Sequence, residues 1–96
     1  MTDVERLMRS YRTGFLRYLS RRDEAPLASG YELGRTAVAA RISVLDLARV
    51  HHDVFLEVLR ETSQEDLTGV ATAASEFFLE VLATYDMAQR AYLDAP

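Results

Sequence analysis

The sequence predicts an all-α protein, a four-helix bundle with a long fourth helix. Apolar side chains recur at every third or fourth position in four segments, which is the spacing of one helix face. Connections of about two to six residues separate these segments, as in bundles of antiparallel neighbours. No segment alternates apolar and polar residues with the period of two that is typical of a β-strand.

Length and composition restrict the class of protein. A chain of 96 residues supports one hydrophobic core, so we expect residues 1–96 to form a single domain. The absence of cysteine excludes disulfides and thiolate metal sites and fits the reducing cytoplasm, where we expect the protein to act. There is no run of 18 apolar residues and no secretory signal pattern at the N-terminus, so we predict no membrane contact.

The first helix is predicted over residues 3–21. Thr2 and Glu5 form the pattern of a capping box before it. Its apolar face consists of Val4, Leu7, Met8, Tyr11, Phe15, Tyr18 and Leu19. Gly14 weakens a helix interior, and we expect it to mark a close helix crossing.

The second helix is predicted over residues 26–40. Pro26 suits the first turn, where a missing N–H costs nothing. Gly30 and Gly34 lie one turn apart and leave a thin strip on this helix. We expect another helix of the same chain to approach closely there, and an intermolecular contact is the alternative.

The third and fourth helices are predicted over residues 44–61 and 64–93. A serine with an aspartate three residues later precedes each of them, which is a signal for a helix start. These pairs are Ser43 with Asp46 and Ser63 with Asp66. The apolar face of the third helix consists of Val44, Leu47, Ala48, His51, Val54, Phe55 and Val58. The face of the fourth consists of Leu67, Val70, Ala71, Ala74, Phe77, Phe78, Val81, Leu82, Tyr85, Ala88 and Tyr92.

The fourth predicted helix is too long for its bundle. At 1.5 Å per residue it measures about 45 Å, and no other segment supports a helix longer than roughly two-thirds of that. Its apolar face must therefore extend past the other helices and be covered by another molecule. That molecule could be another copy in a homodimer, a regulator or a continuing coiled coil, and the dimer or linker residues would be Ala83, Tyr85, Met87, Ala88 and Tyr92.

A second, smaller apolar strip is predicted on the fourth helix. Leu79 and Ala83 lie outside its main apolar face, among polar neighbours. Exposed leucines are common on protein surfaces, but beside an overhanging helix this strip is a candidate contact for a partner helix or a second copy.

Candidate chemical groups are few. The adjacent His51 and His52 point about 100° apart on a helix and cannot easily hold one metal ion, and the Glu-x-x-His motif of di-iron bundles is absent. We therefore predict no metal and no cofactor. We expect His51 to be buried and hydrogen-bonded, for example to Glu32 of the second helix. Glu76 and Glu80 are expected to be solvated acids, and no set of polar residues indicates an enzyme.

The net charge of −4 is unevenly distributed. Residues 1–22 contain six arginines and two carboxylates, whereas residues 23–96 contain five arginines and thirteen carboxylates. An acidic domain is not expected to bind nucleic acid. The basic first segment fits a solvated helix face or a surface that steers a partner.

Several short segments, taken in order, carry a family resemblance. They are YELGR (31–35), SVLDL (43–47), VHH (50–52), FFLEVL (77–82) and YDMA (85–88). Together they resemble the N-terminal regulatory domain of RsbU-type serine/threonine phosphatases, over about residues 11 to 92.

The resemblance implies a dimeric four-helix bundle in front of a metal-dependent phosphatase domain of the type 2C class. It implies that an RsbT-like switch kinase binds the bundle and activates the phosphatase, which dephosphorylates an anti-anti-sigma factor and releases a bacterial stress sigma factor. Residues 1–96 contain no phosphatase domain, so we expect the effector to be attached or associated. By the family's arrangement, the partner-binding residues would be Leu27, Ala28, Tyr31, Arg35, Glu76 and Leu79.

Two other functions stay open at this point. One is a purely structural dimerisation module that receives no signal, and binding of a kinase-like partner separates it from the first. The other is a small-molecule sensor whose pocket is lined by His51, Phe55, Phe77 and Tyr85.

Overall fold

The computed structural model describes residues 1–20 and 28–94, and within them it contains four α-helices and no strand. The elements are α1 (Asp3–Ser20), α2 (Ala28–Ala39), α3 (Val44–Arg60), the short 3-10 helix η1 (Gln64–Asp66) and α4 (Leu67–Asp94). The all-α prediction and the four predicted helices are confirmed. The predicted end of the first helix at Arg21 and the start of the second at Pro26 fall outside the described residues.

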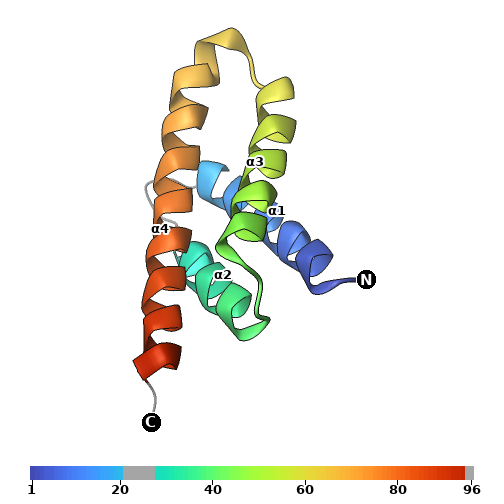
Figure 1. The fold of residues 1–96 in the computed structure, drawn as a ribbon. Coiled ribbons are helices and arrows are strands. Elements are labelled where there is room, and N and C mark those ends of the chain that lie inside the picture. Colours follow the sequence, from blue (N-terminus) through green and yellow to red (C-terminus); the bar gives the residue numbers. More distant parts are fainter. Residues whose placement is uncertain (21–27, 95–96) are drawn as a thin grey trace.

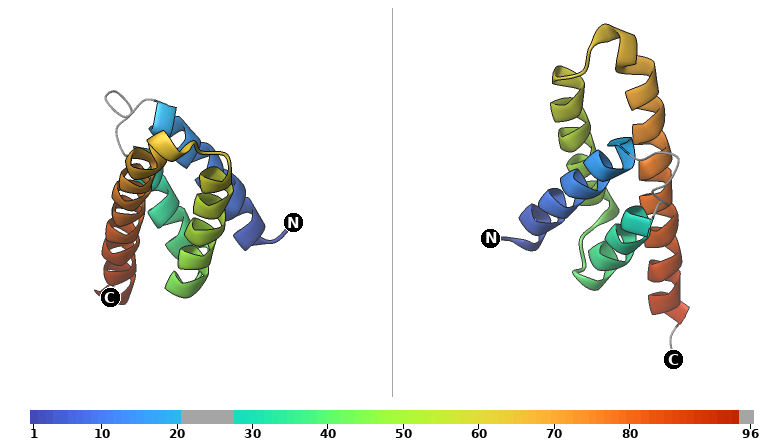
Figure 2. Two further views of the ribbon diagram at one scale, coloured as in Figure 1. Left: turned by 90° about the horizontal axis from the view of Figure 1, so that it is seen from above. Right: turned by 180° about the vertical axis from the view of Figure 1, so that it is seen from behind.

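The long helix α4 runs along the whole molecule (Figure 1). Its 28 residues correspond to about 42 Å, and the molecule measures 51 × 29 × 17 Å. Helix α3 runs antiparallel to the first part of α4, and α1 crosses the two helices on one side, behind them in Figure 1. Helix α2 packs closely against the C-terminal half of α4 (Figures 1 and 2).

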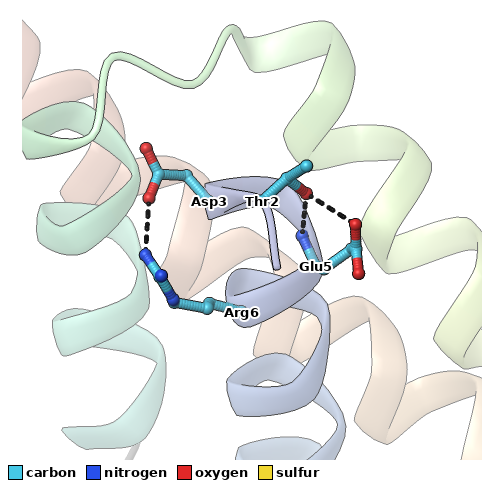
Figure 3. A network of polar contacts seen from close by, with 4 residues as sticks. All are labelled: Thr2, Asp3, Glu5 and Arg6. Atoms are coloured by element: carbon cyan, nitrogen blue, oxygen red, sulfur yellow. Dashed lines mark hydrogen bonds and ion pairs between the residues drawn. The ribbon is translucent and has the colours of Figure 1, made fainter.

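The start of α1 is held by the predicted cap (Figure 3). The hydroxyl of Thr2 accepts a hydrogen bond from the backbone N–H of Glu5 at 3.1 Å and donates to the Glu5 carboxylate at 3.1 Å. Arg6 forms an ion pair with Asp3 at 3.1 Å. The Thr2 oxygen thus satisfies one of the free N–H groups of the first turn, while the Glu5 side chain turns to the hydroxyl.

The two later helix starts differ from one another. Ser43 accepts a hydrogen bond from the backbone N–H of Asp46 at 3.1 Å, which confirms the predicted cap of α3. At the third pair, the Ser63 hydroxyl donates to the Asp66 carboxylate at 3.0 Å and makes no hydrogen bond to the helix backbone. The first turn tightens into η1, so the prediction of one uninterrupted helix from Gln64 was wrong by one turn.

The turn between α2 and α3 is closed by backbone hydrogen bonds around Arg41. Arg41 has a positive φ of 59° and donates to the carbonyl of Val38, while Ile42 donates to the carbonyl of Ala37. This is the Schellman pattern that ends helices, formed here without glycine. The buried hydroxyl of Tyr85 donates to the Ile42 carbonyl at 2.7 Å and so ties the turn to α4.

Phe77 of α4 is the centre of the core and is fully buried. Three rings of α1 surround it: Tyr11 at 5.2 Å between centroids, and Phe15 and Tyr18 at 5.7 Å each. The Tyr11 ring meets Phe77 nearly edge-on, an arrangement that aromatic quadrupoles favour. This aromatic cluster fixes where α1 crosses α4.

His51 joins α3 to the same cluster. Its ring stacks on Phe78 with centroids 4.0 Å apart, and its Nδ1 lies 2.6 Å from the Tyr11 hydroxyl. Burial raises the pKa of Tyr11, so the phenol keeps its proton, and we assign it as the donor to a neutral imidazole. The expected hydrogen bond of His51 is present, but the predicted partner, Glu32, was wrong.

Most of the predicted apolar faces are buried or half-buried, with exceptions at helix ends. The exposed members of those faces are Val44, Leu67, Ala71 and Tyr92. Val50, which was not assigned to the apolar face of the third helix, is buried in the core and lies at helical spacing with Leu47 and Val54. The helical periodicity therefore predicted which face of each helix is apolar. Which residues at the edges of that face are buried depends on how the helices cross.

The glycines mark close helix contacts, as predicted. A Cβ added at Gly14 would lie 3.1 Å from the Ser29 Cβ and 3.3 Å from the Phe77 ring. A Cβ at Gly34 would overlap the Thr84 hydroxyl and lie 2.7 Å from the carbonyl oxygen of Val81. The thin strip of α2 therefore serves internal packing against α4.

We predict opposite behaviour for two alanine substitutions on α2. Gly34→Ala should lower the free energy of unfolding by about 2–3 kcal/mol, because the new methyl group meets backbone atoms that cannot move aside. Gly30→Ala is the matched control: its methyl would meet the flexible Glu80 side chain at 3.3 Å. It should stay within about 1 kcal/mol of wild type because alanine also favours the helix. Urea unfolding checks both, and equal losses would contradict this account.

We also predict a loss of stability in mild acid from His51. Burial, and secondarily the charge of His52, lowers the pKa of His51 from 6.5 to about 4. The stabilisation from its neutral form is complete above pH 6.5 and is lost as the pH falls toward 4. Partial exposure of the ring keeps the expected loss to about 1–2 kcal/mol.

Unfolding measured between pH 7 and pH 4 tests this linkage. His51→Gln should show a much shallower decline over that range, whereas His52→Gln, which removes only the secondary cause of the shift, should decline nearly as steeply as wild type. Identical slopes for wild type and His51→Gln would show that His51 is not the titrating group.

Candidate interaction surface

One side of α4 presents a strip of exposed residues. Glu76, Leu79, Ala83 and Met87 recur every three or four residues, and we call them the outer α4 strip. Leu79 is 63% exposed and Met87 is 59% exposed. The smaller apolar strip predicted from Leu79 and Ala83 therefore lies outside the core, where another molecule can reach it.

A second exposed strip lies on α2. Tyr31 is 41% exposed, and the guanidinium of Arg35 lies 5.7 Å from the centre of its ring. This cation–π contact holds the tyrosine in one orientation on the surface. Ala28 is the first residue of α2, and Leu27 lies outside the described residues. We call Tyr31 and Arg35 the outer α2 pair.

The outer α2 pair and the outer α4 strip border the same helix contact. Gly30, which precedes Tyr31, meets Glu80, which follows Leu79: a Cβ on Gly30 would lie 3.3 Å from the Glu80 Cγ. Tyr31 and Leu79 are therefore exposed sequence neighbours of two residues that meet in the contact between α2 and α4. A flat partner surface or a partner helix could contact both at once.

Glu76 connects the outer α4 strip to the core. Its carboxylate accepts a hydrogen bond from the Tyr18 hydroxyl at 3.2 Å, although the residue as a whole is exposed. The prediction of a fully solvated acid missed this bond because Tyr18 lies on α1, far away in the sequence. A change at Glu76 would therefore affect α1 as well as a bound partner.

Thr84 is a buried polar residue that the sequence analysis missed. Its hydroxyl lies 3.1 Å from the carbonyls of Glu80 and Val81 and 3.4 Å from the carbonyl of Gly30. A threonine can bond to its own helix in this way, so its burial costs little. Gly34 could have indicated this burial, because a position without a side chain on one helix leaves room for a hydroxyl group on the helix packed against it.

The core contacts of α4 end near Ala88. Tyr85 is buried and bonded to Ile42, so it lies inside the protomer rather than on its surface, and Ala88 is half-buried. Residues 89–93 are all exposed, with Tyr92 at 67% and Leu93 at 78%, and we call them the overhang. The overhang carries apolar side chains that no other described helix covers.

The residues proposed for a sensor pocket form packed core contacts instead. Phe77 is fully buried, and the His51 ring stacks with Phe78 at 4.0 Å and with Phe55 at 5.8 Å between centroids. Rings at these separations are in contact and leave no ligand-sized space between them. In the described part of the chain, no group of three or more His, Asp or Glu residues could hold a metal ion.

Among the described residues, the segment Gln64–Leu93 is long and apolar enough to cross a membrane by length and composition. A core helix of a soluble protein can meet the same criterion. Here Phe77, Val81 and Tyr85 of this segment are buried against the other helices. The prediction of no membrane contact, which was made from the absence of 18 consecutive apolar residues, stays a prediction.

Comparison with known proteins identifies one related family. The family described as phosphoserine phosphatase RsbU, N-terminal domain, matches residues 9–88. No curated protein and no solved structure matches this chain. The matched region reaches from α1 to Ala88, the residue at which the core contacts of α4 end.

We predict that Tyr85 contributes to stability while Tyr92 does not. Tyr85→Phe should lower the free energy of unfolding by about 1–2 kcal/mol, because it leaves the buried Ile42 carbonyl without its hydrogen bond. Tyr92→Phe, the same change on the exposed overhang, should stay within about 0.5 kcal/mol of wild type. Thermal unfolding of both variants at one low protein concentration provides the comparison. A greater loss for Tyr92→Phe would contradict the assignment of core and overhang.

Proposed function

The chain belongs to the family of N-terminal domains of the phosphoserine phosphatase RsbU, and from this premise we propose that it is a non-catalytic regulatory domain of a partner-switching pathway. In this proposal it binds an RsbT-like switch kinase and activates an attached or associated type 2C phosphatase, which leads to release of a stress sigma factor. Such a pathway places the protein in the cytoplasm. The observation that carries the proposal is the family match over residues 9–88.

The partner surface in this proposal combines the outer α2 pair with the outer α4 strip. Leu79 supplies an exposed apolar side chain, and Tyr31 supplies an aromatic ring already oriented by Arg35. Tyrosine and arginine are the residue types most often found at energetic centres of interfaces. A side chain that is oriented before binding also loses less entropy when the partner docks.

The proposed mechanism uses α4 as a rigid connection. The partner contacts α4 beside its contact with α2. There Gly34 packs directly against Thr84, so the two helices have no room to shift against each other. A movement of α4 would therefore carry through to the overhang, some 10 to 14 residues beyond Leu79. The partner can shift this equilibrium only if it binds one position of α4 more tightly than the other.

The overhang is the proposed dimer contact. Tyr92 and Leu93 of the overhang, and Met87 at the end of the outer α4 strip, are each more than half exposed. A second copy of α4 packed alongside would cover these apolar side chains and bring two effectors together. A purely structural dimerisation module needs only this contact, so kinase binding is what distinguishes the two functions.

We predict that Leu79→Arg leaves the fold intact but weakens binding of an RsbT-like kinase or self-association at least about tenfold, equivalent to about 1.4 kcal/mol. Leu79 is exposed, so an arginine there should change the free energy of unfolding of the protomer little. It would, however, place a charge in a surface that must lose water on binding. Circular dichroism checks the fold, and titration calorimetry and sedimentation measure the two affinities.

Leu16→Arg is the matched control. Leu16 is another exposed leucine, but it lies on α1 beside Arg12 and Glu57, away from the proposed surface. It should leave both affinities within about twofold of wild type. Unchanged affinities for Leu79→Arg, or equal losses for the two variants, would reject the proposed surface.

A further inference from the structure

The groove between α1 and α2 has no role in the proposed function. The two helices lie side by side (Figure 2), and the groove has a volume of about 540 Å³. Its lining consists of Arg9, Ser10, Thr13, Gly14, Arg17, Ser29, Glu32, Leu33 and Thr36. We propose that this groove binds a small phosphorylated compound.

Two arginines supply the positive charge. Arg9 and Arg17 line the groove from the same side of α1, two turns apart, or about 12 Å along the helix. Within the described residues neither guanidinium makes an ion pair, whereas Arg6 is paired with Asp3 and Arg12 with Glu57. Unpaired arginines are suited to phosphate because their planar group donates two parallel hydrogen bonds to it.

Hydroxyl groups and an apolar floor complete the groove. Ser10, Thr13, Ser29 and Thr36 add side chains that can donate to phosphate oxygens. The Thr13 hydroxyl donates to the Arg9 carbonyl at 3.1 Å in the free protein, so it would have to rotate. Gly14 and Leu33 are buried at the floor, and the missing side chain of Gly14 allows α1 and α2 to approach closely.

Glu32 restricts the kind of anion. Its carboxylate is exposed on the α2 wall of the groove and would repel a ligand that is negative along its whole length. The volume of about 540 Å³ is in the range of small-molecule sites and far exceeds a single phosphate. A compound with its phosphates toward the arginines and a hydrogen-bond donor toward Glu32 fits both features. Nucleic acid and acidic polypeptides do not.

The inference does not depend on the proposed partner surface, because the groove lining includes neither Tyr31 nor Leu79. Calorimetric titration of the full chain with inorganic pyrophosphate and with adenosine diphosphate, at constant ionic strength, tests it. Both probes should bind with a Kd of about 1 mM or tighter. Adenosine diphosphate should bind more tightly because its amino group can donate to Glu32.

Variants of the arginines and of Glu32 test whether the probes bind in this groove. Arg9→Gln with Arg17→Gln should weaken pyrophosphate binding at least about tenfold. Arg49→Gln with Arg60→Gln, which removes the same charge from α3, should change it less than about twofold. Glu32→Ala should strengthen pyrophosphate binding and remove the preference for adenosine diphosphate, because it removes both the negative charge and the hydrogen-bond acceptor. Circular dichroism confirms that each variant is folded.

Three results would overturn the proposal. The first is no binding of either probe at about ten times the expected Kd. The second is an equal loss in the two double variants, which would show attraction by overall charge. The third is binding of poly-glutamate with the same dependence on Arg9 and Arg17, which would point to an acidic polypeptide.

Discussion

The contact between α2 and α4 at Gly34 is the constraint on which the rest of the structure depends. No side chain fits at Gly34, so the backbone of α2 lies directly against Thr84 and the carbonyl of Val81. The following turn is then fixed by the hydrogen bond from Tyr85 to Ile42, which sets where α3 begins. The relative positions of both helices that carry the proposed partner surface therefore follow from one tightly packed seam.

The aromatic cluster packs against the same face of α4, two turns before the contact with Gly34. The Phe77 ring contacts the Tyr11 ring of α1, and the Tyr11 hydroxyl is hydrogen-bonded to His51 of α3. Between residues 73 and 88, α2 and this cluster together cover one continuous face, about half of the circumference of α4. The uncovered half carries Leu79, and the overhang continues past Ala88. One helix thus both completes the core and presents apolar groups to other molecules.

Much of the fold could be predicted because it is local. Helix periods, the caps at Thr2 and Ser43, and the glycine strip of α2 depend on residues close in the sequence. The partner of His51, the bond from Tyr18 to Glu76 and the burial of Tyr85 depend on residues about 40 to 60 positions away. Spacing placed Leu79 outside the core, but joining it to α2 as one partner surface required the family resemblance. The α1–α2 groove was missed because it forms only where two helices pack together, and the spacing within each helix does not show which faces meet.

Sedimentation equilibrium of the wild-type chain tests most directly the claim that apolar groups beyond the bundle are covered by a second copy. The account predicts a mass that rises with concentration to about twice the 10.9 kDa of one chain, with no species between the two. A constant mass of one chain, up to concentrations of about 1 mM, would contradict it.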